Sequence, residues 1–276
     1  MRVLVTGRGT SGSWQIRGVQ LGAAIGADVV SNAPSAAGYD IAVLVKRQRG
    51  DLVRRMQGVP LIWDVVDSWP QPEGNRWDRE RCMQWLREQV ASIKPAGIVA
   101  ATRQMADDCQ EFGVPVLALP HHARPGLKRN PIREQVQVVA YEGGLQYLGR
   151  WMGVVEAECI RRGWRFVTNH GALANADIVV ALRDCDGYAA RALKSNVKLA
   201  NAQGSGTPVV CCREAGYLET ATGAECWADT DAELRDSLDA LSSHEARKAA
   251  SETLFAGTPA LEAIAGKYRQ WLQSKF

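Results

Sequence analysis

The sequence predicts an α/β protein made of two Rossmann-like, doubly wound domains. Its 276 residues are enough for two small domains, each with a core of its own. Short apolar stretches alternate with polar, helix-compatible segments in two successive series, which is typical of parallel sheets with crossover helices. Hydrophobic residues make up 46% and charged residues 23%, values that exclude a disordered, collagen-like or coiled-coil chain.

The first series of apolar stretches predicts an N-terminal domain over residues 1–128. Its expected strands are residues 3–6, 41–45, 61–65, 98–101 and 116–119. The stretch that follows, residues 123–133, has two prolines and several basic residues but little apolar content. We expect this stretch to be a linker that packs poorly in a core.

The second series predicts a domain over residues 129–256, followed by a C-terminal helix over residues 257–276. The expected strands are residues 136–141, 165–168, 178–182, 208–212 and 226–228. The tail repeats large apolar side chains at a spacing of three to four, which predicts an amphipathic helix that packs back on the first domain. Doubly wound sheets bind ligands at the carboxyl ends of their strands, so we expect the two domains to face each other across a cleft that holds the site.

Charge and cysteine usage narrow the class of protein. The net charge of the chain is only +3, but the first 128 residues contain 16 basic and 12 acidic side chains, so any attraction for a polyanion would lie there. The seven cysteines are scattered without metal-ligand spacing, which indicates buried thiols and no metal site. A charged-then-apolar leader and an apolar run of 18 residues are both lacking, so we expect no transmembrane segment and a cytoplasmic location.

Two groups of candidate site residues follow strands of the first domain. The glycine-rich turn with Gly9 and Gly12 could bring backbone N–H groups close to an anion or a sugar hydroxyl, or it could be a plain turn. Asp64 and Asp67, at the end of the third expected strand, could include a general base, and the alternative is a pair of helix caps. His121 follows the last expected strand and is a further catalytic candidate, unless it lies in an exposed turn.

Basic and aromatic residues of the first domain are the candidates for binding an acceptor. Arg47 and Arg49 belong to a basic stretch that could contact phosphates, and the indoles of Trp14 and Trp69 could stack on an acceptor. The alternatives are a solvated helix face and a hydrophobic core. A hydroxymethylated base in DNA is the sharpest acceptor on this hypothesis, beside a glycan or a small molecule.

Residues 194–210 carry the most specific local pattern of the second half. They predict a capped helix, a glycine stop and a buried strand, with Ser195 or Asn196 as the cap. Lys194 and Lys198 are four residues apart, which would place both charges on one helical face beside the helix N-terminus. This is the outline of a diphosphate site, and the alternative is a pair of solvated helix lysines.

Four segments together resemble the nucleotide-sugar half of GT-B glycosyltransferases of the family 4 type. They are the strand after Ala176-Asp177, the turn Asp186-Gly187-Tyr188, the helix that ends in Gly-x-Pro-Val-Val at 206–210, and a Gly-x-x-Glu turn at 216–219. Residues 138–144 are similar to the strand and glycine turn that open that half, and residues 63–67 to a strand of the acceptor domain. Of the two glutamates paired in the family, Asp186 replaces the first and Asn201 stands in the place of the second.

The resemblance implies a glycosyltransferase, hexosyl or pentosyl, that retains the anomeric configuration and uses a nucleotide diphosphate-sugar, a UDP-sugar as first choice, without an obligatory metal. The alternatives are a nucleotide-sugar epimerase of the same fold and a non-catalytic protein that binds a nucleotide-sugar or nucleic acid. Catalysis is expected from Asp64, Asp67, His121 and Asp186. Donor binding is expected from Gly9, Gly12, Gly143, Gly144, Arg183, Lys194, Ser195, Asn196, Lys198, Asn201, Gly216 and Glu219.

Overall fold

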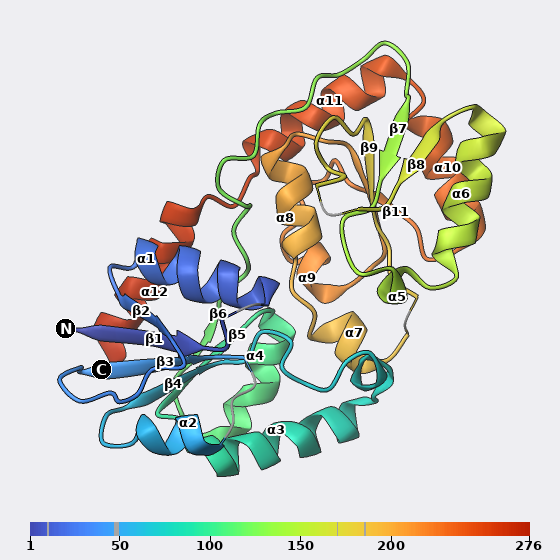
Figure 1. Ribbon diagram of the computed structural model, residues 1–276. Coiled ribbons are helices and arrows are strands. Elements are labelled where there is room, and N and C mark those ends of the chain that lie inside the picture. Colours follow the sequence, from blue (N-terminus) through green and yellow to red (C-terminus); the bar gives the residue numbers. More distant parts are fainter. Residues whose placement is uncertain (10, 47–49, 170, 185) are drawn as a thin grey trace. The chain divides into compact units, whose positions relative to one another are not determined.

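The chain folds into two compact α/β units, each with its own parallel sheet (Figure 1). The computed structural model describes residues 1–9, 11–46, 50–169, 171–184 and 186–276. The first unit contains Met1–His121, Gly187–Ser195 and Ala260–Phe276, and the second contains His122–Asp186 and Asn196–Pro259. The nine residues Gly187–Ser195 therefore belong to the first unit, although the chain on both sides of them belongs to the second. We call this segment the excursion. The domain boundaries expected from the sequence were continuous and placed these residues in the second domain.

Within the described residues, the sheet of the first unit has six parallel strands in the order β2-β1-β3-β4-β5-β6. The strand order reverses between β1 and β3, which makes their carboxyl ends the switch point where such sheets bind ligands. The five expected strands are confirmed, and β2 was missed because it is a mostly exposed edge strand. The strands are β1 Val3–Gly7, β2 Asp28–Ser31, β3 Ile41–Val45, β4 Leu61–Asp64, β5 Gly97–Ala100 and β6 Val116–Ala118.

Helices cover both faces of this sheet, and a hydrophobic cluster lies under each layer. The C-terminal helix α12 buries Ile264, Tyr268 and Trp271 in the cluster that also contains Val5 of β1, so the predicted return of this helix to the first unit is confirmed. The helices are η1 Trp14–Gln20, α1 Leu21–Ala24, α2 Gly50–Arg55, η2 Glu73–Arg76, α3 Arg79–Ile93, α4 Arg103–Cys109, η3 Gln110–Phe112, α7 Tyr188–Ala192 and α12 Leu261–Lys275.

The second unit contains a parallel sheet in the order β11-β10-β9-β7-β8. Its order reverses between β7 and β9, so a second switch point lies at their carboxyl ends. All five strands expected from the sequence are present: β7 Val138–Ala140, β8 Arg165–Val167, β9 Ile178–Ala181, β10 Val209–Cys211 and β11 Cys226–Trp227.

The helices of the second unit enclose one large cluster of buried apolar side chains. Local signals set their ends: the hydroxyl of Thr230 accepts from the amide of Glu233 while the Glu233 side chain accepts from Thr230 N, a capping box that begins α10. The helices are α5 Leu145–Leu148, α6 Trp151–Arg162, α8 Val197–Gly204, α9 Ala215–Leu218, α10 Asp231–Ala240 and α11 His244–Ala256.

The stretch expected to be a poorly packed linker, residues 123–133, belongs to the second unit. Asn130 is buried there, and its side-chain amide donates to the carbonyl of Leu173 at 2.7 Å and to the hydroxyl of Thr207 at 2.9 Å. Low apolar content is thus compensated by buried hydrogen bonds, which a composition argument does not detect. The six described cysteines are free thiols, and five of them are buried.

Candidate functional site

The switch point of the second unit gathers side chains from three strand ends. Tyr141 follows β7, Arg183 follows β9, and Glu214 follows β10 and is the N-cap residue of α9. Parallel strands end at one edge of a sheet, so residues distant in the sequence meet here. Nε of Arg183 lies 2.6 Å from Oε1 of Glu214, and the two side chains are buried together.

Lys198, in the first turn of α8, places its ammonium at this switch point. Its Nζ lies 5.5 Å from the centroid of the Tyr141 ring. The turn after β7 passes directly beside it, because a Cβ added to Gly143 would lie 3.0 Å from Cε of Lys198. The Tyr141 hydroxyl donates to the carbonyl of Gly144 at 3.2 Å and fixes the turn. A side-chain-free turn beside a lysine is an arrangement that can receive an anion.

Arg183 is held in place by Glu214, which also affects neighbouring groups. Burial raises the pKa of Tyr141 to about 12, with Glu214 acting in the same direction and Arg183 against it, so the phenol is neutral at physiological pH. Burial likewise raises the pKa of Cys212, whose thiol donates to Oε1 of Glu214 at 3.3 Å. Because these pKa values are raised, the phenol and the thiol stay protonated and are poor nucleophiles.

The predicted pairing of Lys194 with Lys198 on one helical face is wrong. Helix α8 begins at Val197 with the buried Asn196 as its N-cap residue, so Lys194 lies outside the helix. Lys194 and Ser195 belong to the first unit, whereas Asn196 and Lys198 belong to the second. An i, i+4 spacing places two side chains on one face only if both residues lie in the same helix. Lys194 belongs to the excursion before α8, so this condition is not met.

Asn201 takes part in a polar network that the sequence did not indicate. Its Oδ1 accepts from the backbone N–H of Arg124 at 2.9 Å, and the guanidinium of Arg124 makes two 2.9 Å bonds to the carboxylate of Glu142. Glu142 follows Tyr141 at the end of β7 and could have been found from that strand-end position. Of the other predicted donor residues, Gly216 is buried at the start of α9 and Glu219 is half-buried at its end. The catalytic candidate Asp186 is exposed.

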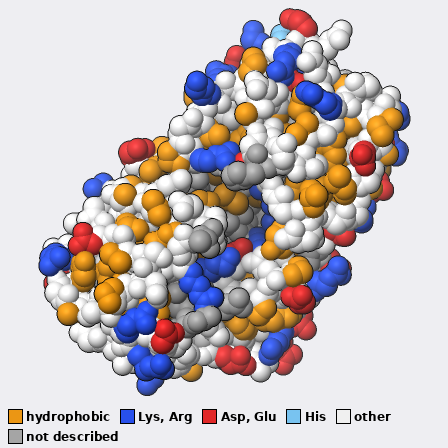
Figure 2. Space-filling view, viewed as in Figure 1, with side chains coloured by type: hydrophobic (Ala, Val, Ile, Leu, Met, Phe, Trp, Pro, Cys, Tyr) orange, Lys and Arg blue, Asp and Glu red, His pale blue; other side chains and the backbone are white. Residues whose placement is uncertain are grey.

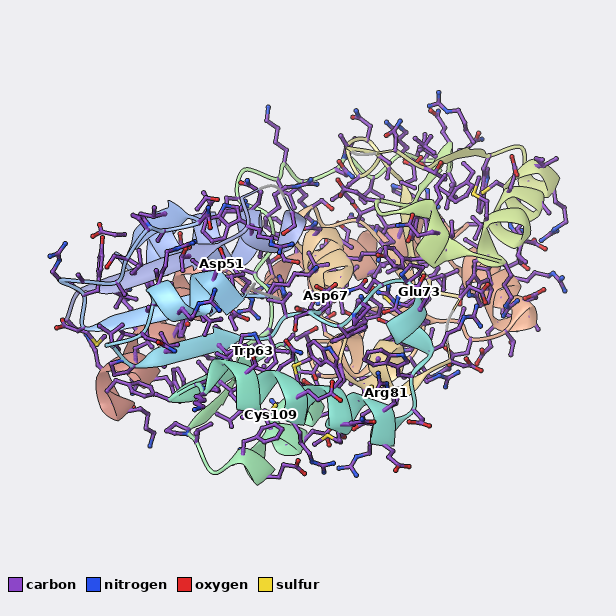
Figure 3. The ribbon with its side chains drawn as sticks, turned by 60° about the horizontal axis from the view of Figure 1, so that its bottom comes forward. Asp51, Trp63, Asp67, Glu73, Arg81 and Cys109 are labelled. Atoms are coloured by element: carbon purple, nitrogen blue, oxygen red, sulfur yellow. The ribbon has the colours of Figure 1, made fainter. Side chains whose placement is uncertain are left out.

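The switch point of the first unit contains a compact ionic cluster around Asp67, which lies beyond the carboxyl end of β4 (Figure 3). Oδ1 of Asp67 is 2.8 Å from Nζ of Lys46, and Oδ2 is 3.1 Å from Nζ of Lys194. The hydroxyl of Ser13 lies 3.4 Å from both the Lys46 ammonium and the Asp67 carboxylate. Burial would raise the pKa of Asp67, but Lys194 and Lys46 outweigh it and hold that pKa well below its usual range. A carboxylate with such a low pKa is a weak general base.

The backbone is strained on both sides of this cluster. Lys46 has φ of 65° and Val66 has φ of 51°, a left-handed conformation that is rare for a β-branched residue. Lys46 is fixed by its amide, which donates to the carbonyl of Asp64 at 2.8 Å, and by its own carbonyl, which accepts from the Trp63 indole at 3.1 Å. Strain of this kind costs about 1–3 kcal/mol per residue and concentrates at functional sites.

Asp64 does not lie in this cluster. Its side chain is buried, with Oδ2 3.7 Å from Nε of Arg17. A second Arg17 nitrogen donates to the carbonyl of Leu119. Burial raises the pKa of Asp64, although Arg17 opposes that shift. A carboxyl enclosed in the core cannot contact a substrate, so the structure argues against the predicted catalytic role.

The two predicted stacking residues do not present an exposed ring. Trp14 is 4% exposed and packs so closely on Gly7 that a Cβ there would lie 2.8 Å from the indole, and Trp69 is 3% exposed. Both rings are buried in hydrophobic clusters of the first unit, which agrees with the alternative interpretation that they are core residues. His121 is buried just beyond β6, and Gly9 lies against the Ser31 side chain in the turn after β1. Arg47 and Arg49 lie outside the described residues.

Charged side chains of both signs occur on the surface, and the described residues contain no group of possible metal ligands. Lys and Arg side chains are interspersed with Asp and Glu over the face shown in Figure 2. Among the described residues, no group of three or more His, Cys, Asp or Glu side chains is arranged to hold a metal ion. In the same part of the chain, every helix is too short or too polar to cross a membrane.

No protein-family model and no curated protein matches the sequence. Among solved structures, HepE of Anabaena in complex with UDP and glucose is 10% identical with a TM-score of 0.69, over 99% of this chain and 100% of that one. Sucrose-phosphate synthase from Thermosynechococcus elongatus is 12% identical with a TM-score of 0.64, over 99% of both chains. WaaG, a glycosyltransferase of lipopolysaccharide biosynthesis, is 14% identical with a TM-score of 0.62, over 97% of this chain and 98% of that one. The chain therefore has the GT-B fold, as the sequence predicted.

Proposed function

We propose that the protein is a glycosyltransferase that moves a sugar from a nucleotide diphosphate-sugar to an acceptor hydroxyl. The second unit binds the donor, for which a UDP-sugar is the first choice, and the first unit binds the acceptor. The GT-B fold supports this proposal, as do the bound UDP and glucose in the similar HepE structure. Because fold alone does not specify chemistry, the proposal depends on the residues at the second switch point.

The single observation that carries the proposal is the position of the Lys198 ammonium beside the Gly143–Gly144 turn. Arg183 is buried against Glu214 at 2.6 Å, whereas Lys198 lies directly beside the glycine turn, and we therefore assign Lys198 as the cation that contacts the diphosphate. The absence of side chains on the turn lets backbone N–H groups approach the same phosphate oxygens. Charge on the leaving diphosphate grows as the glycosidic bond breaks, and a fixed ammonium there stabilises the transition state.

We further propose that this lysine and the turn neutralise the diphosphate without an obligatory metal ion, and that the sugar is transferred with retention. His121 and Asp186 stay as catalytic candidates, whereas Asp67 acts as the counter-ion of two lysines. Turnover that survives EDTA would support the first point. The anomeric configuration of the product, read by proton NMR at early times, decides the second.

The direct experiment is calorimetric titration of the whole protein with UDP, ADP, GDP and their glucose conjugates. We expect one nucleotide series to bind, and Lys198→Met to weaken it by about 10- to 100-fold, the loss of one charged hydrogen bond. Lys248, an exposed lysine of α11 in the same unit, provides the matched control, Lys248→Met. If no nucleotide binds the wild-type protein, or if both variants bind equally well, the proposed donor site is wrong.

Acceptor-dependent release of the nucleoside diphosphate separates this function from its alternatives. A transferase releases UDP only when an acceptor hydroxyl is present. An epimerase changes the sugar of the donor without an acceptor, and a binding protein does neither. A glycan or a small molecule is the proposed acceptor, because three arginines of the first unit that could contact a polyanion are already paired with carboxylates.

A further inference from the structure

We propose that the cluster of Lys46, Asp67 and Lys194 in the first unit is a binding subsite for a single anionic group, a phosphate or carboxylate, carried by the acceptor. The assignment of this site to the acceptor rests on the proposed transferase function, whereas the anion site itself does not. The cluster lies at the β1/β3 switch point, where a doubly wound sheet binds its ligand.

The charge of the cluster is the first argument. Two ammonium groups face one carboxylate, at 2.8 and 3.1 Å, so the three side chains together carry a charge of +1. Lys194 is only 6% exposed and compensates Asp67 from the interior, while Lys46 is 30% exposed. The surplus positive charge is therefore presented to solvent by Lys46.

The rigidity of the cluster is the second argument. Lys194 also donates to Oε1 of Gln71 at 2.7 Å, and Gln71 donates to the carbonyl of Asp67 at 2.8 Å, so the carboxylate and the buried lysine are fixed together. Nζ of Lys194 lies 5.1 Å from the centroid of the Trp69 ring, a second support for its charge. Preorganised charges of this kind bind an anion with little loss of side-chain entropy.

Space for a ligand is the third argument. Ser13, whose hydroxyl contacts Lys46 and Asp67, follows Gly12, and a Cβ added to Gly12 would meet no atom of the described residues within 4 Å. The turn is thus open next to the exposed ammonium. Nζ of Lys46 lies 3.4 Å from the Ser13 hydroxyl next to this turn, and the depressed pKa of Asp67 keeps the charge balance unchanged throughout the neutral range.

The test measures the affinity of inorganic phosphate from the rise of the unfolding midpoint at constant ionic strength, with sodium chloride as the matched salt. Lys198→Met serves as the background, because it disables the proposed donor diphosphate site. In that background we expect Lys46→Met to weaken phosphate binding about tenfold or more. Lys267→Met, on the exposed side of α12, is the control and should change nothing.

A second variant gives an effect of opposite sign, which loss of folding cannot imitate. Asp67→Asn keeps the shape of the side chain but raises the charge of the cluster to +2, so phosphate should bind about threefold or more tightly. The proposal is overturned if phosphate stabilises no more than chloride, if Lys46→Met binds it normally, or if Asp67→Asn binds it less well.

Titration with UDP separates the acceptor subsite from the donor site. Lys46→Met in the wild-type background should bind UDP with unchanged affinity. A tenfold loss would assign the anion to the donor diphosphate and overturn the acceptor assignment. If the wild-type protein binds no UDP but phosphate binding follows the three variants as expected, the donor function fails and the anion site stands.

Discussion

Nζ of Lys194 lies 3.1 Å from Oδ2 of Asp67, although 127 residues separate them in the sequence. This ion pair is one of several contacts that anchor the excursion Gly187–Ser195 in the first unit. The hydroxyl of Tyr188 donates to Asp108 at 2.7 Å, and the hydroxyl of Thr102 donates to the carbonyl of Ala192 at 2.8 Å. Lys194 comes shortly before α8 in the sequence, but it belongs to the first unit, whereas α8 belongs to the second.

The contrast between Lys198 and Lys194 gives the first prediction. Lys198→Met should weaken binding of the donor nucleotide by about 1.5–3 kcal/mol, because it removes a charged contact to phosphate. Lys194→Met should leave nucleotide binding unchanged, since Lys194 contacts Asp67 and Gln71 of the first unit. Calorimetric titration of both variants checks this, and equal losses would contradict the separation of the two lysines.

The sequence predicted the fold well because buried parallel strands leave a strong signal. Runs such as 41–45 and 178–181 are continuous and apolar, and both are fully buried strands. The edge strand β2 carries little of this signal, since its side chains face solvent. The return of α12 was readable from a 3–4 spacing that matches one apolar face.

The site was harder to predict because its parts come from distant segments. Lys198 and Gly143 were both candidates, but only the structure places them side by side. Asp64 and Asp67 look equivalent in the sequence, yet Asp64 ends β4 and is buried beside Arg17, whereas Asp67 lies beyond the strand next to two lysines. The four-residue spacing of Lys194 and Lys198 wrongly predicted that both lie in one helix, because α8 begins only at Val197.

The buried pair of Arg17 and Asp64 predicts a pH-dependent stability. Asp64 has a pKa raised above 3.8 by burial, and Arg17 is the charged group that lowers it. In Arg17→Met the pKa of folded Asp64 should rise further. The contribution of Asp64 to stability is then complete below about pH 4, the range of its unfolded pKa, and is lost as the pH rises through the higher pKa of the folded state. Urea unfolding at pH 5 and pH 8 should show a larger drop than in the wild type. The double variant Arg17→Met/Asp64→Asn is the control and should lose that extra drop.

Glu158 of α6 predicts the opposite pH dependence in the second unit. Burial would raise its pKa, but hydrogen bonds from Arg162, Arg161 and Arg235 outweigh it and lower the pKa from 4.5 to about 2. Its contribution to stability is therefore present above about pH 4.5 and is lost as the pH falls towards 2. Urea midpoints between pH 5.5 and 2.5 should fall less steeply in Glu158→Gln, and parallel slopes would contradict the assignment.

Duplex DNA provides the test of the polyanion hypothesis for the acceptor. A protein that neutralises phosphates must lose affinity with log salt at a slope of about −0.9 per phosphate. In the first unit Arg55 is 3.1 Å from Asp51, Arg79 is 2.9 Å from Asp108, and Arg87 is 2.7 Å from Glu111. A contact to DNA by any of these three arginines would have to break its ion pair, so we expect binding to be weak, with a slope shallower than about −2.

A filter-binding assay from low to high salt measures that slope directly. Arg79→Gln with Arg87→Gln is the matched variant, and on our expectation it leaves the slope unchanged because these side chains do not contact phosphate. A steep slope that flattens in the double variant would restore the polyanion acceptor. In that case Arg79 and Arg87 would leave Asp108 and Glu111 when DNA binds, and the two carboxylates would become solvated or protonated.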